Sequence, residues 1–143
     1  MRKILLSLTA LATLTSVNVF SQNYWESQFS GFFEDSRGIA GIHAANANTV
    51  WGYAYDGTGA IPLIQEFTKT SDGGQTWESG EIYLGNPDLS IQNIVSVDAN
   101  TAWVMASVEG DGTGGVFKTS DGGANWVFQK GGTSPDSWNN WVH

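Results

Sequence analysis

The stretch that decides the fold is Thr70-Ser-Asp-Gly-Gly-Gln-Thr-Trp77, which returns as Thr119-Ser-Asp-Gly-Gly-Ala-Asn-Trp126. The two final tryptophans lie 49 residues apart. A fixed period of roughly 20–50 residues is typical of propellers, solenoids and other arrays of one supersecondary unit. The motif therefore predicts that the chain contains two copies of one structural unit.

The sequence around each motif follows the same plan of short strands and tight turns. Along residues 49–55, Trp51, Tyr53 and Tyr55 fall on one face and smaller residues on the other, which is typical of a strand between closely stacked sheets. Four strands in about 50 residues make a blade of a β-propeller. Strands are predicted over 39–45, 49–55, 64–69 and 78–84, and again over 91–97, 101–108 and 115–119.

The predicted fold is all-β, with two four-stranded β-propeller blades over 38–90 and 91–134. Residues 135–143 are the expected start of a third blade, because Val142 aligns with Ile42 and Ile94. Propellers close with about four to eight blades. We therefore expect an incomplete propeller, the N-terminal fragment of a longer protein.

The first 21 residues have the pattern of a secretory signal peptide. Arg2 and Lys3 precede an apolar run over 4–14 that is too short for a membrane span, and Ser21 is a suitable small residue for cleavage. Residues 22–37 are aromatic and acidic and form a lead-in segment, interpreted as a strand that completes a blade. The chain has no cysteine, so neither disulfides nor a lipid anchor is expected. We expect a secreted or cell-surface protein.

The charge of the chain excludes several classes of partner. After removal of the signal peptide, the basic residues are Arg37, Lys69, Lys118 and Lys130, against 14 acidic residues. A surface this acidic argues against nucleic acid and anionic membrane as partners. A soluble extracellular role fits this excess of acidic over basic residues.

The repeated motif has the residues needed to stabilise a β-hairpin. An Asp in a turn accepts hydrogen bonds from nearby backbone N–H groups, and glycines supply backbone angles that other residues resist. A buried Trp contributes roughly 150–250 Å² of contact. Asp72 and Asp121 are therefore predicted to fix hairpins that Trp77 and Trp126 attach to the blades.

This pattern resembles the Asp-box, or bacterial neuraminidase repeat, of sialidases, some β-glucan hydrolases and the photosystem II stability/assembly factor-like propellers. The resemblance implies that the boxes are structural and lie at the outer edge, away from the central funnel. Asn125 stands where the family has Thr or Ser, which leaves open one hydrogen bond of the second box. The matching residues are Thr70, Asp72, Gly74, Thr76, Trp77, Thr119, Asp121, Gly123 and Trp126.

The order of signal peptide, residues 31–39 and blades also resembles large exported bacterial proteins. That resemblance implies further blades and a C-terminal sorting domain in the full-length protein.

Four further residues are candidates for a ligand site in the funnel. Glu34, Asp35 and Arg37 lie just before the first strand, either as such a site or as a solvated turn with a local ion pair. His43 aligns with His143, but Val95 holds that position in the second copy, which favours packing or a hydrogen bond over metal ligation. The Asp-Gly-Thr-Gly turns at 56–59 and 111–114 lack the run of oxygen ligands of a calcium loop. No metal or cofactor is expected.

The resulting function is an extracellular binding or scaffold module for a glycan or protein, without catalysis by these residues. The alternative is part of a sialidase-like or endoglucanase-like glycoside hydrolase. Resemblance to sialidases implies three arginines around a carboxylate, a Tyr nucleophile with its Glu, and an acid/base Asp. The mature chain offers only Arg37, so missing blades must supply the rest. A weaker third hypothesis is an assembly-factor role.

Overall fold

The structure is a computed structural model that describes residues 27–59, 63–110 and 113–132. The predicted signal peptide over 1–21 and the predicted start of a third blade over 135–143 lie outside these residues, as does His143.

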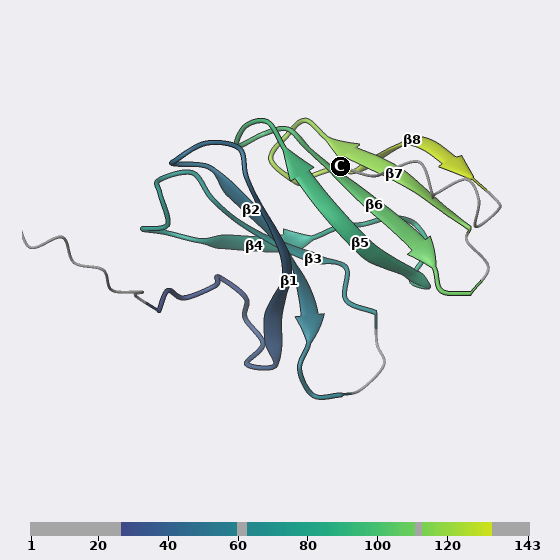
Figure 1. Cartoon of the computed structure of the whole chain (residues 1–143), viewed down its shortest axis with the longest axis horizontal. Coiled ribbons are helices and arrows are strands. Elements are labelled where there is room, and N and C mark those ends of the chain that lie inside the picture. Colours follow the sequence, from purple (N-terminus) through teal and green to yellow (C-terminus); the bar gives the residue numbers. More distant parts are fainter. Residues whose placement is uncertain (1–26, 60–62, 111–112, 133–143) are drawn as a thin grey trace, which may run out of the picture.

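The described residues form two four-stranded antiparallel sheets and no helix, which confirms an all-β fold (Figure 1). Strand order follows the sequence in both: β1-β2-β3-β4 in sheet 1 and β5-β6-β7-β8 in sheet 2. The strands are β1 Arg37–Ala44, β2 Val50–Asp56, β3 Glu66–Thr70, β4 Glu78–Glu81, β5 Leu89–Ser96, β6 Ala102–Val108, β7 Gly114–Thr119 and β8 Val127–Gly132.

Strand boundaries differ from the prediction by one to three residues at most ends, and two of these differences are informative. Strand β1 begins at Arg37, inside the segment predicted to precede the first repeat. Strand β4 ends at Glu81, whereas the predicted strand continued to 84. Ile82 and Leu84 are buried in the core, so the apolar pattern of this stretch reflects burial outside the sheet.

The first three strands of the two sheets repeat each other in register as well as in order, whereas the β7–β8 pairing has a shift between Val116 and Phe117 that the β3–β4 pairing lacks. In β1 the pairing with β2 shifts between Ile39 and Gly41, and in β5 the pairing with β6 shifts between Ile91 and Asn93. One extra residue at the same place in both first strands is a β-bulge, which bends and twists the strand locally. Equivalent residues can therefore be compared position by position.

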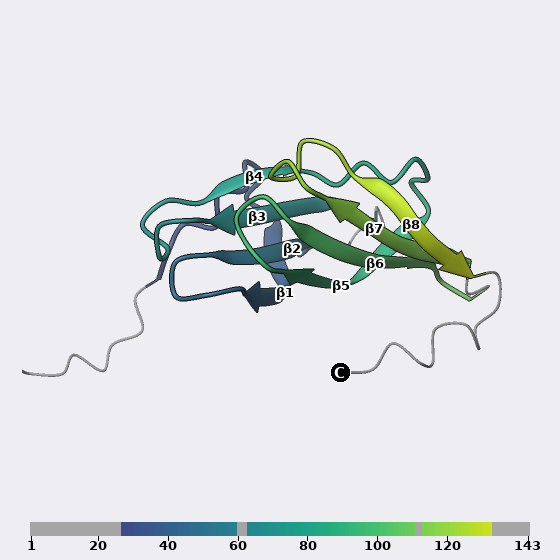
Figure 2. The ribbon, with the colours of Figure 1, turned by 90° about the horizontal axis from the view of Figure 1, so that it is seen from above.

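Sheet 2 packs face to face on sheet 1, mainly through β5 against β1 and β2. Seen from above, the strands run in the same order from β1 and β5 on one side to β4 and β8 on the other (Figure 2). Trp51 is fully buried in this contact, with its ring centre 5.1 Å from Phe67 and 6.3 Å from Trp126. Rings at these spacings pack favourably beyond their buried area.

Residues 27–36 form no strand, so the expectation that the lead-in segment completes a blade as a strand is wrong for this part of it. Gly31 has a φ of 82°, outside the extended region. The segment is held instead by side chains of sheet 1. Thr68 Oγ1 donates to Ser30 O and Ser79 Oγ donates to Gly31 O at 2.8 Å, while Phe32 is 4 % exposed. We call residues 28–33 the strap.

Within the described ranges, no helix is long and apolar enough to cross a membrane.

Candidate functional site

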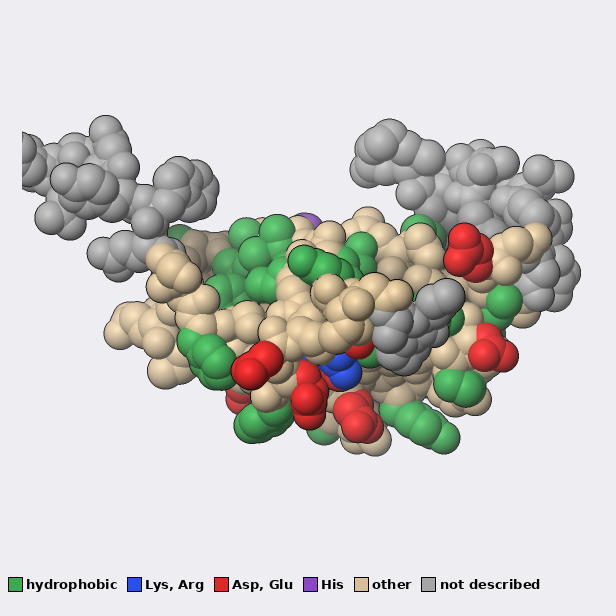
Figure 3. All heavy atoms as spheres, turned by 90° about the horizontal axis from the view of Figure 1, so that it is seen from below, with side chains coloured by type: hydrophobic (Ala, Val, Ile, Leu, Met, Phe, Trp, Pro, Cys, Tyr) green, Lys and Arg blue, Asp and Glu red, His purple; other side chains and the backbone are tan. Residues whose placement is uncertain are grey.

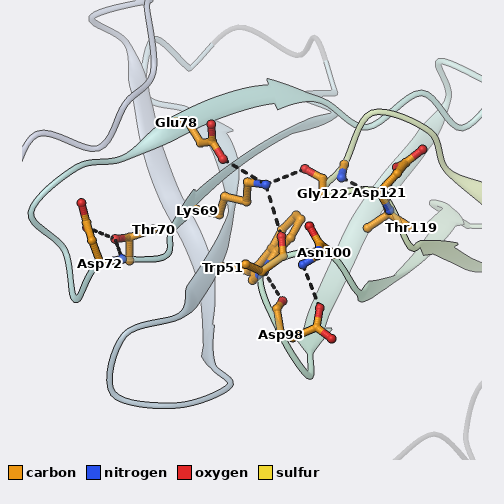
Figure 4. Close-up of polar contacts among 12 residues, drawn as sticks. Trp51, Lys69, Thr70, Asp72, Glu78, Asp98, Asn100, Thr119, Asp121 and Gly122 are labelled. Carbon is orange, nitrogen blue, oxygen red and sulfur yellow. Dashed lines mark hydrogen bonds and ion pairs between the residues drawn. The ribbon is translucent and has the colours of Figure 1, made fainter.

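The first repeated motif is a hairpin closed around Asp72 (Figure 4). Its Oδ1 accepts hydrogen bonds from Thr70 Oγ1 at 2.7 Å and from Thr76 N at 2.9 Å. Its Oδ2 accepts from Thr76 Oγ1 at 2.6 Å, and Thr70 Oγ1 in turn accepts from Gly74 N at 2.9 Å. Both carboxylate oxygens are therefore engaged inside the hairpin.

The second hairpin repeats these bonds around Asp121. Thr119 Oγ1 donates to Oδ1 at 2.8 Å, and Gly123 N donates to Thr119 Oγ1 at 2.9 Å. Asn125 stands at the position of Thr76 and donates the same two hydrogen bonds to Asp121. Its backbone N donates to Oδ1 at 2.9 Å, and its side-chain Nδ2 donates to Oδ2 at 2.8 Å. The hydrogen bond left open for Asn125 is thus present, because an amide N–H donates as a hydroxyl does.

Two consecutive glycines turn each hairpin with positive φ. The values are 75° and 88° for Gly73 and Gly74, and 77° and 96° for Gly122 and Gly123. Other residues rarely adopt this region. The backbone conformation of each turn therefore requires the Gly-Gly pair of the motif.

Hydrogen bonding lowers the pKa of both Asp side chains. Bonds from the Thr76 side chain and backbone and from Thr70 lower the pKa of Asp72 to about 2. Bonds from Asn125, and then from Thr119, lower the pKa of Asp121. Carboxylates stabilised in the ionised form are poor proton donors near neutral pH.

The two motif tryptophans have different surroundings. Trp77 Nε1 donates to Gln28 Oε1 of the strap at 3.1 Å. Trp126 lies between the sheets, with its ring centre 6.1 Å from Phe67, and its buried Nε1 has no hydrogen-bond partner among the described residues.

Arg37 is bound by two acids that the sequence hypothesis did not include. Its Nη1 lies 3.0 Å from Asp56 Oδ2 and its Nε lies 3.0 Å from Glu66 Oε1. These acids come from β2 and β3, whereas Glu34 and Asp35 are exposed in the preceding turn. This end of the molecule is seen from below in Figure 3, where acidic side chains gather around a basic one.

The Arg37 ion pairs also shift the pKa values of the paired groups. The Glu66 hydrogen bond raises the pKa of Arg37, and hydrogen bonds from Thr58, with the nearby Arg37 charge, lower the pKa of Asp56. The guanidinium is already neutralised by carboxylates of its own sheet.

His43 joins the two sheets. Its Nδ1 accepts a 3.1 Å hydrogen bond from Ser96 N and lies 3.1 Å from Ser96 Oγ. No group of three or more His, Cys, Asp and Glu side chains suited to a metal occurs in the part of the chain that the structure describes.

Sequence reasoning missed Lys69, which connects the sheets most directly. Its ammonium donates to Gly122 O at 2.9 Å and to Ala99 O at 3.2 Å, and lies 5.0 Å from the centre of the Trp51 ring (Figure 4). Trp51 Nε1 donates to Asp98 O at 3.0 Å. The available signal was a Lys directly before the first Thr of both motifs, Lys69 and Lys118.

A hollow of about 470 Å³ lies between the start of β5 and the β7–β8 pair. Phe117 and Phe128 form part of its wall, with ring centres 5.4 Å apart. By register they match Thr68 and Ser79 of sheet 1, which hold the strap. The lining residues are Asn86, Leu89, Thr113, Gly114, Phe117, Phe128 and Gly131.

Comparison with known protein families, characterised proteins and solved structures finds no match for this chain. The fold and the repeat define an all-β protein built from two stacked, near-equivalent antiparallel sheets.

Proposed function

We propose that the chain is part of an exported Asp-box β-propeller and acts as an extracellular binding or scaffold module for a protein or glycan. The two sheets are the first two blades, and further blades belong to the full-length protein. The observation that carries a non-catalytic role is the internal use of Asp72, Asp121 and Arg37. Asp72 and Asp121 are bound within their hairpins, Arg37 by Asp56 and Glu66.

The hollow beside Phe128 is the binding site that the geometry favours. Small-molecule sites are concave, about 300–1,000 Å³ in volume and mostly apolar, with a few polar groups that fix orientation. The hollow falls in this range and has Leu89 and two phenylalanines beside Asn86. Because sheet 1 holds the strap at the equivalent positions, a short segment of a peptide or oligosaccharide is the kind of ligand that we propose for this hollow.

The test is a binding titration by calorimetry with extended peptides, sialosides and β-glucan oligosaccharides. We expect binding without turnover, and loss of binding in Phe128→Ala. Phe29→Ala is the matched control, since Phe29 is also exposed but lies outside the hollow. Hydrolysis of a sialoside or β-glucan that Arg37→Ala abolishes would refute the proposal and favour the glycoside hydrolase.

A further inference from the structure

The hollow lies on the face of sheet 2 that packs on sheet 1. Phe117 pairs with Val104, which is fully buried against sheet 1, and directly paired residues of neighbouring strands share one face of a sheet. Asn86 reaches the hollow from the connection between β4 and β5, which joins the two sheets. The further blades proposed above continue from the opposite face of sheet 2, so they do not fill this space.

The lining of the hollow is uncharged. Among the described residues that form its wall, none is acidic or basic. Arg37, the basic group that a sialoside carboxylate would need, is already bound by Asp56 and Glu66. Because binding surfaces and their ligands are complementary in charge, the part of a ligand that enters the hollow is uncharged.

The backbone oxygens of several lining residues are already used within the fold. Asn86 O and Leu89 O accept hydrogen bonds from Gln65 Nε2 at 2.8 Å and 2.9 Å. Thr113 O accepts from Val108 N at 2.7 Å. A sugar ring has a hydroxyl group on most of its carbons, and each hydroxyl that is buried without a partner costs free energy. The lining therefore favours an apolar group over an oligosaccharide.

Phe128 presents an aromatic ring to the hollow. A Cβ at Gly115 would lie 2.4 Å from Phe128 Cε2, and a Cβ at Gly131 would lie 2.7 Å from Phe128 Cζ. The ring thus lies directly over the backbone of these two glycines, and a side chain at either position would displace it. Phe128 is still 55 % exposed. A ring held from one side in this way is available for stacking with a second ring, at a centre-to-centre distance of about 4.5–7 Å.

Asn86 adds a hydrogen-bond donor that the fold does not use. Its Oδ1 accepts from Asp88 N at 2.9 Å, whereas its Nδ2 has no hydrogen-bond partner in the ranges that the structure describes. An amide N–H of this kind can donate to a peptide carbonyl. The strap is held on sheet 1 by the same kind of contact, since Ser79 Oγ donates to Gly31 O at 2.8 Å.

We infer that the hollow binds an aromatic side chain of a peptide, stacked on Phe128, with a neighbouring peptide carbonyl that accepts from Asn86 Nδ2. This inference rests on the binding role proposed above and names the class of ligand for the same site. The strap is an example of such a segment at the equivalent place on sheet 1, where Phe32 follows Gly31 and is 4 % exposed. The volume of about 470 Å³ is in the lower part of the range for ligand sites and accommodates one side chain with its backbone.

The test is a calorimetric titration of the full chain with blocked tetrapeptides that differ at one position. The peptide Ser-Gly-Phe-Ser keeps the order of residues 30–32, and Ser-Gly-Leu-Ser and Ser-Gly-Ser-Ser replace its ring. A β-glucan tetrasaccharide and a sialyllactose are the glycan probes. The phenylalanine peptide should bind about fivefold more tightly than the leucine peptide, which is on the order of the contribution of one aromatic pair. The serine peptide and both glycans should not bind.

Phe128→Leu keeps an apolar side chain and removes the ring. This variant should bind the phenylalanine peptide no more tightly than the leucine peptide, whose own affinity should change little. Phe29→Leu is the matched control, because Phe29 is 76 % exposed outside the hollow, and it should keep the fivefold preference. Circular dichroism checks that each variant is folded. A preference for the phenylalanine peptide that survives in Phe128→Leu would overturn the inference.

Asn86→Asp keeps the acceptor for Asp88 N and removes the Nδ2 donor. It should weaken binding of the phenylalanine and leucine peptides alike by about fivefold, the order of one hydrogen bond, and leave the ratio between them unchanged. Asn93→Asp adds the same charge at an exposed position outside the hollow and should bind both peptides as the parent chain does. Unchanged binding in Asn86→Asp would overturn the contact assigned to Asn86.

The ligand series separates this inference from the broader binding role. Equal affinity for the phenylalanine and leucine peptides, or tighter binding of a glycan than of either peptide, would overturn the inference and leave the binding role in place. No binding of any peptide or glycan would remove both the inference and the role proposed for the hollow.

Discussion

Lys69 and Gly122 belong to different sheets, yet the Lys69 ammonium donates a 2.9 Å hydrogen bond to the Gly122 carbonyl. The acceptor lies within the Gly-Gly turn of the second motif, whose shape is fixed by Asp121. A local hairpin therefore also presents a carbonyl to the preceding sheet. The motif contributes to contact between the repeats as well as to its own turn.

Lys69→Met should destabilise the protein by about 2–4 kcal/mol, because two charge-assisted hydrogen bonds, the 3.0 Å ion pair with exposed Glu78 and the contact with Trp51 are lost while the apolar stem remains. Urea unfolding monitored by tryptophan fluorescence measures the change. Lys130→Met, at an exposed position on β8, serves as the control and should have little effect. Equal effects in the two variants would contradict the role of Lys69.

Ile94→Ala and Ile42→Ala test the asymmetry between the sheets at equivalent positions. Ile94 is buried between the sheets, so its truncation should cost about 2–5 kcal/mol. Ile42 is exposed, so its truncation should change the free energy of unfolding by less than about 0.5 kcal/mol in dilute protein. A similar cost at both positions would show that something covers Ile42 in solution.

Protonation of Asp72 should lower the stability of the fold at acid pH. Its folded pKa of about 2 lies below the ordinary 3.8, so its ionised form stabilises the fold fully above pH 3.8. That stabilisation is lost as the pH falls from 3.8 to about 2. The melting temperature should therefore decline less steeply over this range in Asp72→Asn. Asp35→Asn, at an exposed position outside both hairpins, should keep the full decline; an unchanged slope in Asp72→Asn refutes the prediction.

Trp51→Phe should cost at least about 1 kcal/mol more than Trp126→Phe. The first change removes the hydrogen bond to Asp98 O and leaves a carbonyl without its donor. The second removes a buried N–H that has no partner in the part of the chain described, so only ring contacts are lost. Guanidinium unfolding of both variants gives the comparison, and the reverse order would contradict it.

The repeat made the all-β fold and the two four-stranded sheets predictable from sequence. The alternation of large and small residues along β2 and β6 can be seen within each strand, and the matched motifs align the two copies with each other. The sheet-to-sheet contacts were not predictable in the same way, because Lys69 and Trp51 bind backbone carbonyls of Asp98, Ala99 and Gly122. A carbonyl is common to all residues and leaves no signature in the sequence.

The candidate site also combines contacts that the sequence predicts with contacts that it does not. The bonds of Asp72 close within four residues, so the motif alone suggests them. Arg37 instead pairs with acids 19 and 29 positions away, which only the pairing of β1, β2 and β3 brings together. Proximity in sequence favoured Glu34 and Asp35, but both lie in an exposed turn. The lead-in segment carried no periodicity, and the strap within it is held by the side chains of Thr68 and Ser79.

The bulge shared by β1 and β5 has a consequence for the contact between the sheets. It lies between Ile39 and Gly41 in one strand and between Ile91 and Asn93 in the other. A bulge leaves the backbone groups of its extra residue outside the ladder. In β5 that residue is Gln92, whose carbonyl accepts a 3.0 Å hydrogen bond from Tyr53 Oη of sheet 1, so the irregularity of one sheet supplies an acceptor to its neighbour.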